Sequence, residues 1–328
     1  MIVEERVHGV RLDAPGIATS RSRTSAWDGP LKTVLRVLPL VALAELLLMR
    51  TFYRVGIHIP KEEPFRTIYA VLTAIGSFAL NLSTILAGAA LVLLGVRAWL
   101  RGSRSATASI LAFVAASVVL AAAGPSELGP MARLVFAWAV LVIVVPFLVM
   151  PGRVGERVAV GLVAAVALLS SYAGLAADGA VFAPSSAAPG GIVGAQLIAE
   201  ALVIVTALAM FVAWVRGDGL RPGPLLLAIA PALALFGLWR ANGAITGILV
   251  LWTAGLRLYL PVWIYAVALW AFAATAIGWR RRMPWRTGGM VLLLVAGMLL
   301  GSTYVQGLLL IALVLLTDGA AVGGLPRR

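Results

Sequence analysis

Residues 67–96 read TIYAVLTAIGSFALNLSTILAGAALVLLGV. This stretch runs for 30 residues without a charged side chain, and about 20 largely apolar residues are enough for an α-helix to cross the hydrocarbon core of a bilayer. Strands of a membrane barrel alternate apolar and polar residues over roughly ten positions, and this run does not. The stretch therefore predicts a membrane-spanning helix.

Eight further segments have the same character. Together they predict nine transmembrane helices, at 34–53, 67–96, 106–123, 133–150, 158–176, 191–215, 223–251, 259–279 and 289–317. The whole chain agrees, because 62% of its 328 residues are hydrophobic and 12% are charged, whereas a soluble domain is about 45–50% apolar and about 25% charged. We expect an all-α, polytopic integral membrane bundle. It divides into a cytoplasmic polar tail at 1–32, the transmembrane bundle at 33–318 and a short C-terminal tail at 319–328.

Two of the runs leave the helix count open. The 223–251 run contains Trp-Arg-Ala-Asn-Gly at 239–243, and asparagine and glycine are poor helix formers. The 289–317 run has Gly-Ser-Thr at 301–303, near its centre. If either run is broken or doubles back, the count becomes ten.

The spacing of the runs also allows an inverted repeat. A shift of 155 residues lays the first four runs over the last four and places Glu45 on Glu200. Five runs separate the start of the two units, so the units would have opposite orientations, as in many secondary transporters. Evenly spaced helices also overlay by chance, and that is the alternative.

Basic residues predict the orientation. With the N-terminus in the cytoplasm, 15 lysines and arginines fall on the cytoplasmic side and 8 on the outer side, where the chain would end. The segment RRRMPWR at 280–286 is the firmest anchor. Trp99, Trp214 and Trp279 lie near run ends, where an aromatic belt is expected. The inner (plasma) membrane therefore accounts for the net charge of +13, and we expect the lipid bilayer and not nucleic acid as the partner.

The sequence excludes several chemistries. Cysteine is absent and histidine occurs only at His8 and His58, outside the apolar runs. Thiolate nucleophiles, iron–sulfur clusters, cysteine-bound zinc and a haem held by two membrane histidines are therefore excluded. Phosphate-binding loops and hydrolase motifs are also missing. We expect no cofactor, no metal and no catalytic residue.

Ionisable and amide side chains inside apolar runs are the candidates for a substrate or ion pathway. They are Glu45, Asn81, Gln196, Glu200, Arg240 and Asn242. A charged group in hydrocarbon costs several kcal/mol, so the two glutamates should face the bundle interior. Gln196 lies four residues before Glu200 and shares its helix face. A structural clasp between helices is the alternative for each of these residues.

Arg240 is the one basic residue deep in an apolar run. Asn242 beside it favours a broken helix, which would offer backbone amides and a guanidinium to an anionic group near the midplane. Outward snorkelling, or an internal salt bridge, is the structural alternative.

The 67–96 run carries a polar stripe. Its members recur at spacings of three and four, on one helix face: Thr73, Ser77, Asn81, Thr84 and Gly88. The stripe could line a wet pathway, and close helix packing is the commoner reason for such a pattern. The last run repeats the theme with Thr303 and Gln306, and the fifth with Ser170 and Ser171.

Three functions fit these observations. A permease for a small solute leads, because the extramembrane mass is small and two carboxylates lie within the membrane. A non-catalytic subunit or anchor of a larger membrane complex is the second, and the scarcity of buried polar groups favours it. The third is a membrane enzyme acting on lipid-linked substrates through the outer loop with His58, Glu62 and Glu63.

Overall fold

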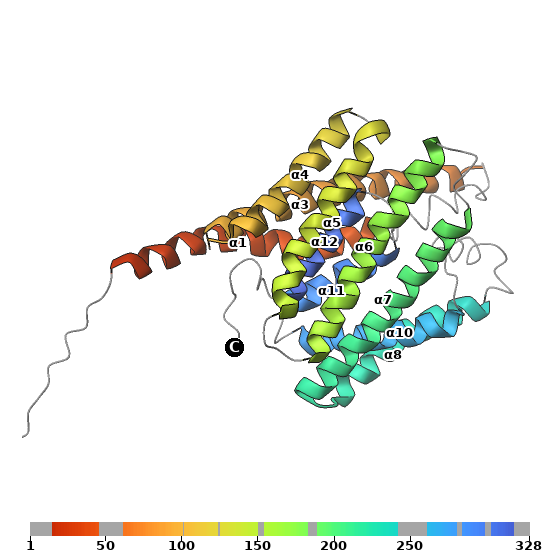
Figure 1. The fold of residues 1–328 in the computed structure, drawn as a ribbon. Coiled ribbons are helices and arrows are strands. Elements are labelled where there is room, and N and C mark those ends of the chain that lie inside the picture. Colours follow the sequence, from red (N-terminus) through yellow and green to blue (C-terminus); the bar gives the residue numbers. More distant parts are fainter. Residues whose placement is uncertain are drawn as a thin grey trace, which may run out of the picture.

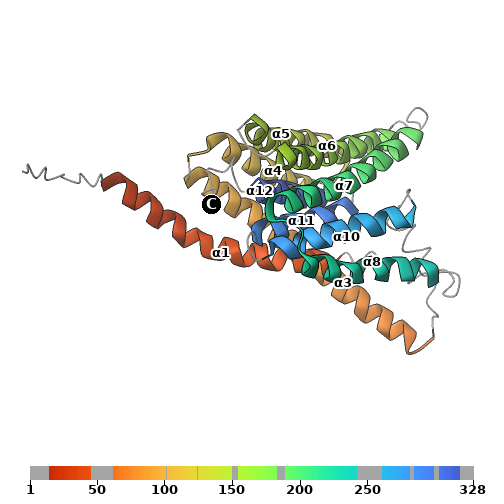
Figure 2. The same cartoon turned by 90° about the horizontal axis from the view of Figure 1, so that it is seen from below.

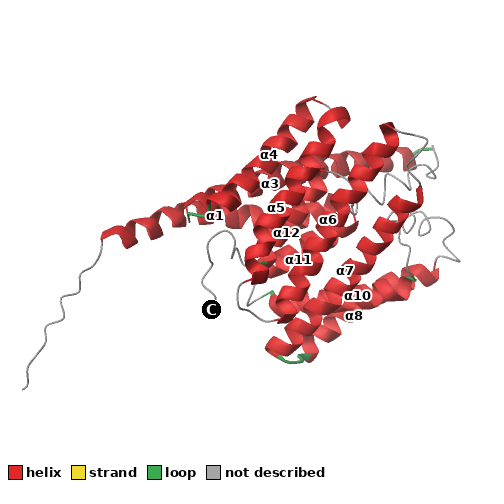
Figure 3. Cartoon of the chain, in the orientation of Figure 1, coloured by secondary structure: helices red, strands yellow, loops and turns green. Residues whose placement is uncertain are grey.

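The computed structural model describes residues 15–45, 62–100, 102–123, 125–149, 154–182, 189–241, 261–280, 284–298 and 303–317. These residues form ten α-helices and no strand (Figure 3). The helices are α1 (Pro15–Glu45), α3 (Phe65–Leu100), α4 (Arg104–Ala123), α5 (Pro125–Val149), α6 (Val154–Phe182), α7 (Pro189–Asp218), α8 (Pro222–Ala241), α10 (Val262–Trp279), α11 (Pro284–Met298) and α12 (Thr303–Leu316).

Four helical segments are long and apolar enough to cross a membrane. They are Phe65–Leu100, Arg104–Ala122, Pro130–Val149 and Ala201–Asp218. Their outward faces are apolar as well. On α5 the exposed side chains recur every three or four residues: Leu134, Trp138, Leu141, Val145 and Leu148. A continuous apolar face of this kind is unusual on a soluble monomer, so the helices indicate a membrane protein. The predicted count of nine spans is not confirmed.

Helix α12 lies in the middle of the bundle (Figures 1 and 2). It packs against α3, α5, α6 and α11, and every residue from Val305 to Thr317 is buried. The reason lies in its sequence, VQGLLLIALVLLT, which is apolar on all sides of a helix. A helix without a polar face is stable when it is surrounded.

The 289–317 run doubles back. Helices α11 and α12 have 15 and 14 residues, which makes each about 22 Å long, less than the roughly 30 Å of a hydrocarbon core. A Cβ built on Gly289 would lie 3.1 Å from both the Ala312 carbonyl oxygen and the Leu315 Cβ. The start of α11 therefore touches the end of α12, and the two helices form an antiparallel hairpin. Glycine at position 289 permits this close approach.

The hairpin changes the predicted topology. One pocket is lined by Trp279 at the end of α10, Arg286 at the start of α11 and Leu316 at the end of α12. The chain therefore leaves α12 at the end of the bundle that carries the 280–286 arginines, and the expected exit on the opposite side is wrong. The first turns of α6 and the last turns of α7 line the same pocket. This agrees with the sequence prediction, in which basic residues put these helix ends on the same side of the membrane as the 280–286 arginines. The membrane side that this end faces stays a prediction.

Helix α1 begins at Pro15, inside the segment predicted as a polar tail. Its first half extends beyond the other helices (Figure 2), and its second half packs against α3 and α11. The buried side chains of that half follow helical spacing: Leu31, Leu35, Leu38, Ala42 and Glu45.

The helix pairing does not follow the predicted inverted repeat. In the first unit α1 packs on α3, whereas α7, its counterpart, packs mainly on α6 and α10. The counterpart of the single helix α5 is the α11–α12 hairpin. Among the described helices, the overlay of Glu45 on Glu200 has no counterpart in the helix contacts.

Candidate functional site

Glu45 is the predicted pathway residue with the clearest placement. It ends α1 and is 1% exposed. It continues the buried face of α1 that begins at Leu31, because 31, 35, 38, 42 and 45 share one side of a helix. The prediction that this carboxylate faces the bundle interior is consistent with its burial.

Gln306 is the second polar residue of the interior. It is 1% exposed and lies in the first turn of α12. Neither its Oε1 nor its Nε2 has a hydrogen-bond partner among the residues that the structure describes. Buried amides are almost always bonded, and an unbonded polar group costs about 1–3 kcal/mol. Such a group is expected where a water, an ion or a solute completes the site.

Helix contacts relate Gln306 and Glu45 to the arginine-rich end of the bundle. A Cβ on Gly288 would lie 3.9 Å from the Leu35 carbonyl oxygen, so α1 and α11 are level there. Glu45 lies about 15 Å further along α1 than Leu35, at 1.5 Å per residue. Gln306 lies about 12 Å back along α12 from the turns that touch Gly289. Each residue therefore lies roughly 12–15 Å along its own helix from these contacts.

The polar stripe of α3 is not an interior feature. Asn81 is exposed, as are Phe78 and Ile85 on the same side of the helix. The Thr84 hydroxyl donates to the Leu80 carbonyl of its own helix at 2.8 Å, and the Thr73 hydroxyl bonds its own helix in the same way. The buried face is formed by smaller residues, which let α3 approach its neighbours. These are Gly76, Ala79, Ser83, Ala87 and Ala90.

Four predicted residues are placed less fully. Gln196 and Glu200 lie within α7 and Arg240 within α8, but their side chains are outside the described part of the structure, as is Asn242 entirely. The backbone of Arg240 lies about 27 Å along α8 from its start at Pro222. That position is one residue before the end of α8 at Ala241, and the midplane position expected for Arg240 stays a prediction.

Other buried polar side chains hold helices together. The Ser171 hydroxyl on α6 donates to the Arg133 carbonyl on α5 at 3.0 Å. The Trp270 Nε1 on α10 donates to the Leu225 carbonyl on α8 at 3.1 Å. Hydrogen bonds across helices are the usual role of such groups in a bundle. Ser171 therefore serves packing, as the alternative predicted.

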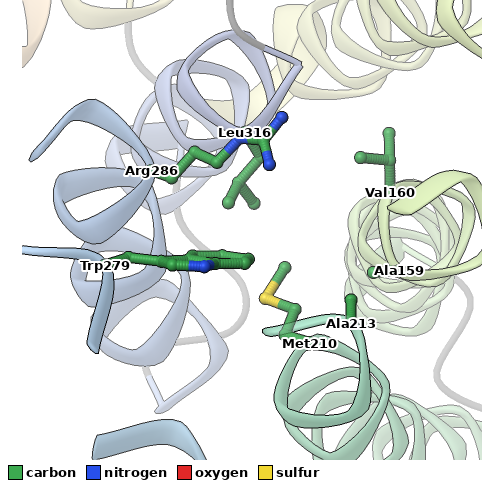
Figure 4. A pocket seen from close by; sticks show the side chains of 7 residues that line it. All are labelled: Ala159, Val160, Met210, Ala213, Trp279, Arg286 and Leu316. Carbon is green, nitrogen blue, oxygen red and sulfur yellow. The ribbon is translucent and has the colours of Figure 1, made fainter. Parts of the chain in front are cut away.

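A pocket opens at the arginine-rich end of the bundle (Figure 4). Its empty volume is about 280 Å³, including the space at its open side. Arg286 lines it and is 7% exposed, with its Cζ 5.5 Å from the ring centroid of Trp279. The other lining residues are apolar: Ala159, Val160, Met210, Ala213 and Leu316.

This pocket corrects the predicted aromatic belt. Trp99 is exposed, in keeping with the belt, but Trp214 and Trp279 are buried. Trp214 lies against Gly278, where an added Cβ would come within 3 Å of the indole. Sequence reasoning also missed Arg286 as a buried residue, because it belongs to a run of arginines that resembles a surface anchor. The sequence did contain a signal for Gln306, because it is the one amide side chain near the Gly-Ser-Thr break at 301–303.

Only the end of the predicted outer loop, from residue 62 onward, lies within the described part of the structure. Glu62 and Glu63 are exposed, and the Thr67 hydroxyl donates to Glu63 Oε2 at 2.7 Å at the start of α3. His58 lies outside the described residues. Within the described ranges, no three histidine, aspartate or glutamate residues are grouped as metal ligands.

Comparison with known proteins assigns no family. No protein-family model, curated protein or solved structure matches the chain.

Proposed function

We propose that the chain is an integral membrane permease for a small solute, in the inner (plasma) membrane with its N-terminus in the cytoplasm. Gln306 carries the proposal. Its amide is enclosed in the centre of an apolar bundle, and it has no hydrogen-bond partner among the described residues. An amide does not titrate, so it suits the binding of a solute better than acid–base catalysis.

The α11–α12 hairpin supports a transport site at this position. Helices that end inside the membrane are a common device in transporters, because their terminal backbone groups face the solute near the midplane. Gln306 lies in the first turn of α12, where the backbone N–H groups lack acceptors within the helix. The proposed site therefore combines these N–H groups with the Gln306 amide.

Glu45 is the proposed coupling group. It is 1% exposed, and carboxylates within membranes commonly carry the proton or cation that drives uptake. In this proposal the solute binds at Gln306 and the proton or cation at Glu45. The two roles predict different mutant behaviour: loss of binding at Gln306, and loss of coupling at Glu45.

Transport through proteoliposomes tests the proposal. Vesicles containing the full chain and the pH dye pyranine are challenged with a panel of amino acids, sugars, organic acids and monovalent cations. We expect at least one solute to move with protons, Gln306→Leu to abolish that flux, and Glu45→Gln to uncouple it. Asn81→Leu removes an amide from the outer face of α3 and is the matched control, with flux unchanged. Wild-type vesicles that pass no member of the panel contradict the permease function.

A second candidate, a subunit of a membrane complex, has one observation of its own. The exposed Asn81 lies between Phe78 and Ile85 on the outside of α3, and an amide facing lipid costs free energy unless a neighbouring helix bonds it. Under this candidate, extraction in a mild detergent yields a stoichiometric partner that Asn81→Leu releases. Under the permease proposal the same variant changes neither composition nor flux.

A further inference from the structure

The two polar atoms of Gln306 ask for different partners. Its Oε1 accepts hydrogen bonds and its Nε2 donates them, and neither atom has a partner among the residues that the structure describes. The side chain is 1% exposed, so bulk water does not satisfy it. A halide or a metal cation bonds only one of the two atoms. The amide therefore selects a solute that carries both a hydrogen-bond acceptor and a hydrogen-bond donor.

The start of α12 favours a negative charge at this place. Gln306 lies in the first turn of α12, and the side chain of a helical residue leans toward the N-terminus of its helix. The amide is therefore directed along the turn whose positive dipole end attracts anions. The helices packed on α12 are α3, α5, α6 and α11, and among their described side chains there is no carboxylate. A cationic solute would find no counter-charge on those side chains, whereas the helix end stabilises an anion.

The surroundings of this turn are apolar. A Cβ on Gly307 would lie 3.6 Å from Leu91 Cδ1 and 3.8 Å from Phe113 Cε1, so α3 and α4 approach the start of α12 there. Phe113 also packs on Phe136 of α5, with 5.6 Å between the ring centroids. Leu91 lies about 14 Å along α3 from its end at Leu100. Apolar walls this far from the helix end suit a short carbon body with a single charge, because each further charge in such surroundings costs several kcal/mol.

We propose that the site at Gln306 takes a small organic monoanion with a hydrogen-bond donor beside its carboxylate, as in a 2-hydroxy acid. The Gln306 Nε2 donates to the carboxylate at the positive end of α12, and Oε1 accepts from the hydroxyl. Both atoms that lack a described partner are then bonded. This inference rests on the proposed solute site and adds the chemical class of the solute.

Binding and transport of one probe, measured separately on the full chain, test the inference. The probe is radiolabelled 2-hydroxypropionate, and three relatives with the same carbon skeleton compete with it in detergent. Propionate lacks the hydroxyl donor, 2-hydroxypropionamide lacks the charge, and alanine carries an ammonium group in place of the hydroxyl. We expect 2-hydroxypropionate to bind about tenfold or more tightly than each relative, because a buried polar group that is left unbonded rejects the analogue.

Variants of Gln306 assign the binding to its amide. Gln306→Leu removes both bonding atoms, and Gln306→Glu replaces the donor Nε2 with an oxygen that repels the carboxylate of the solute; we expect neither variant to bind the probe. Thr317→Val is the matched control at the other end of α12. Thr317 is also 1% exposed, and its hydroxyl donates to the Val314 carbonyl of its own helix at 3.0 Å. Its loss should leave the affinity for 2-hydroxypropionate unchanged.

The possible results separate the solute class from the permease function. Equal affinity of the wild type and Gln306→Leu, or tighter binding of 2-hydroxypropionamide or alanine, overturns the solute class. Transport of another solute without binding of 2-hydroxypropionate also overturns it and leaves the permease function intact. Binding of 2-hydroxypropionate without flux of any solute supports the class and contradicts the permease function. Absence of both binding and flux overturns both.

Discussion

Neighbouring glycines at the start of α11 allow a sharp test of the hairpin. A Cβ on Gly288 would meet nothing closer than 3.9 Å, which is ordinary van der Waals contact. A Cβ on Gly289 would lie 3.1 Å from the Ala312 carbonyl oxygen and 3.1 Å from the Leu315 Cβ. Both of those atoms are fixed to the backbone of α12, so they cannot rotate away.

The expected magnitude follows from the difference between the two positions. Glycine to alanine within a helix stabilises by roughly 0.5–1 kcal/mol, and this gain is common to Gly288→Ala and Gly289→Ala. Overpacking costs about 1–3 kcal/mol in a site that cannot relax. Because α12 is enclosed by other helices, it cannot relax without moving them. We expect Gly289→Ala to be about 1–3 kcal/mol less stable than Gly288→Ala.

Unfolding in detergent measures this difference. Both full-length variants are titrated with sodium dodecyl sulfate, and helix content by circular dichroism together with tryptophan fluorescence gives the free energy of unfolding. Gly288→Ala should equal or exceed the wild type in stability, and Gly289→Ala should fall below Gly288→Ala. Equal stability of the two variants would refute the close antiparallel contact between α11 and α12.

Three further predictions concern other contacts. Gly278→Ala should destabilise the protein by about 1–3 kcal/mol, because the new methyl group meets the buried indole of Trp214. Gly88→Ala is the control, because its Cβ meets no atom within 4 Å. Equal thermal stability of the two variants contradicts the close packing of Trp214 on Gly278. Gln306→Leu should raise the melting temperature, because it removes two unbonded polar atoms; a lower melting temperature would mean that the amide is structurally bonded. Ser171→Ala should cost about 0.6 kcal/mol, the average for hydrogen bonds between membrane helices, and an unchanged free energy of unfolding would show that the Arg133 carbonyl finds another donor.

The helical membrane class could be predicted, because it follows from composition and run length alone. The hairpin could not, because a single run of 29 residues and two half-length helices have the same hydropathy. Whether the run forms one helix or a hairpin depends on the break at 301–303 and on the close contact at Gly289. That contact joins residues that are far apart along the chain. Glu45 was identified from sequence because a carboxylate in an apolar run has few stable places except the interior.

The arginine pocket shows the other limit of sequence reasoning. Arg286 lies beside Arg280 in a basic segment, and such segments usually anchor helices at the membrane surface. Its burial requires Trp279 from one helix and Met210 and Val160 from two others, which no local pattern reveals. Asn81 was misplaced for a similar reason. Its stripe is centred about 120° around the helix axis from the buried face at Gly76 and Ala79, at about 100° per residue, and periodicity alone does not show which of the two faces packs against neighbouring helices.

The position of α12 at the centre also constrains biogenesis. The ribosome synthesises this helix after every helix that surrounds it, so the earlier helices must be inserted while their shared interior is still vacant. Lipid or the insertion machinery must occupy that space until the hairpin enters. A nascent chain that is arrested before Thr303 would lack α12, the helix that α3, α5 and α6 enclose. Quality-control proteases would encounter such a chain as an incomplete bundle.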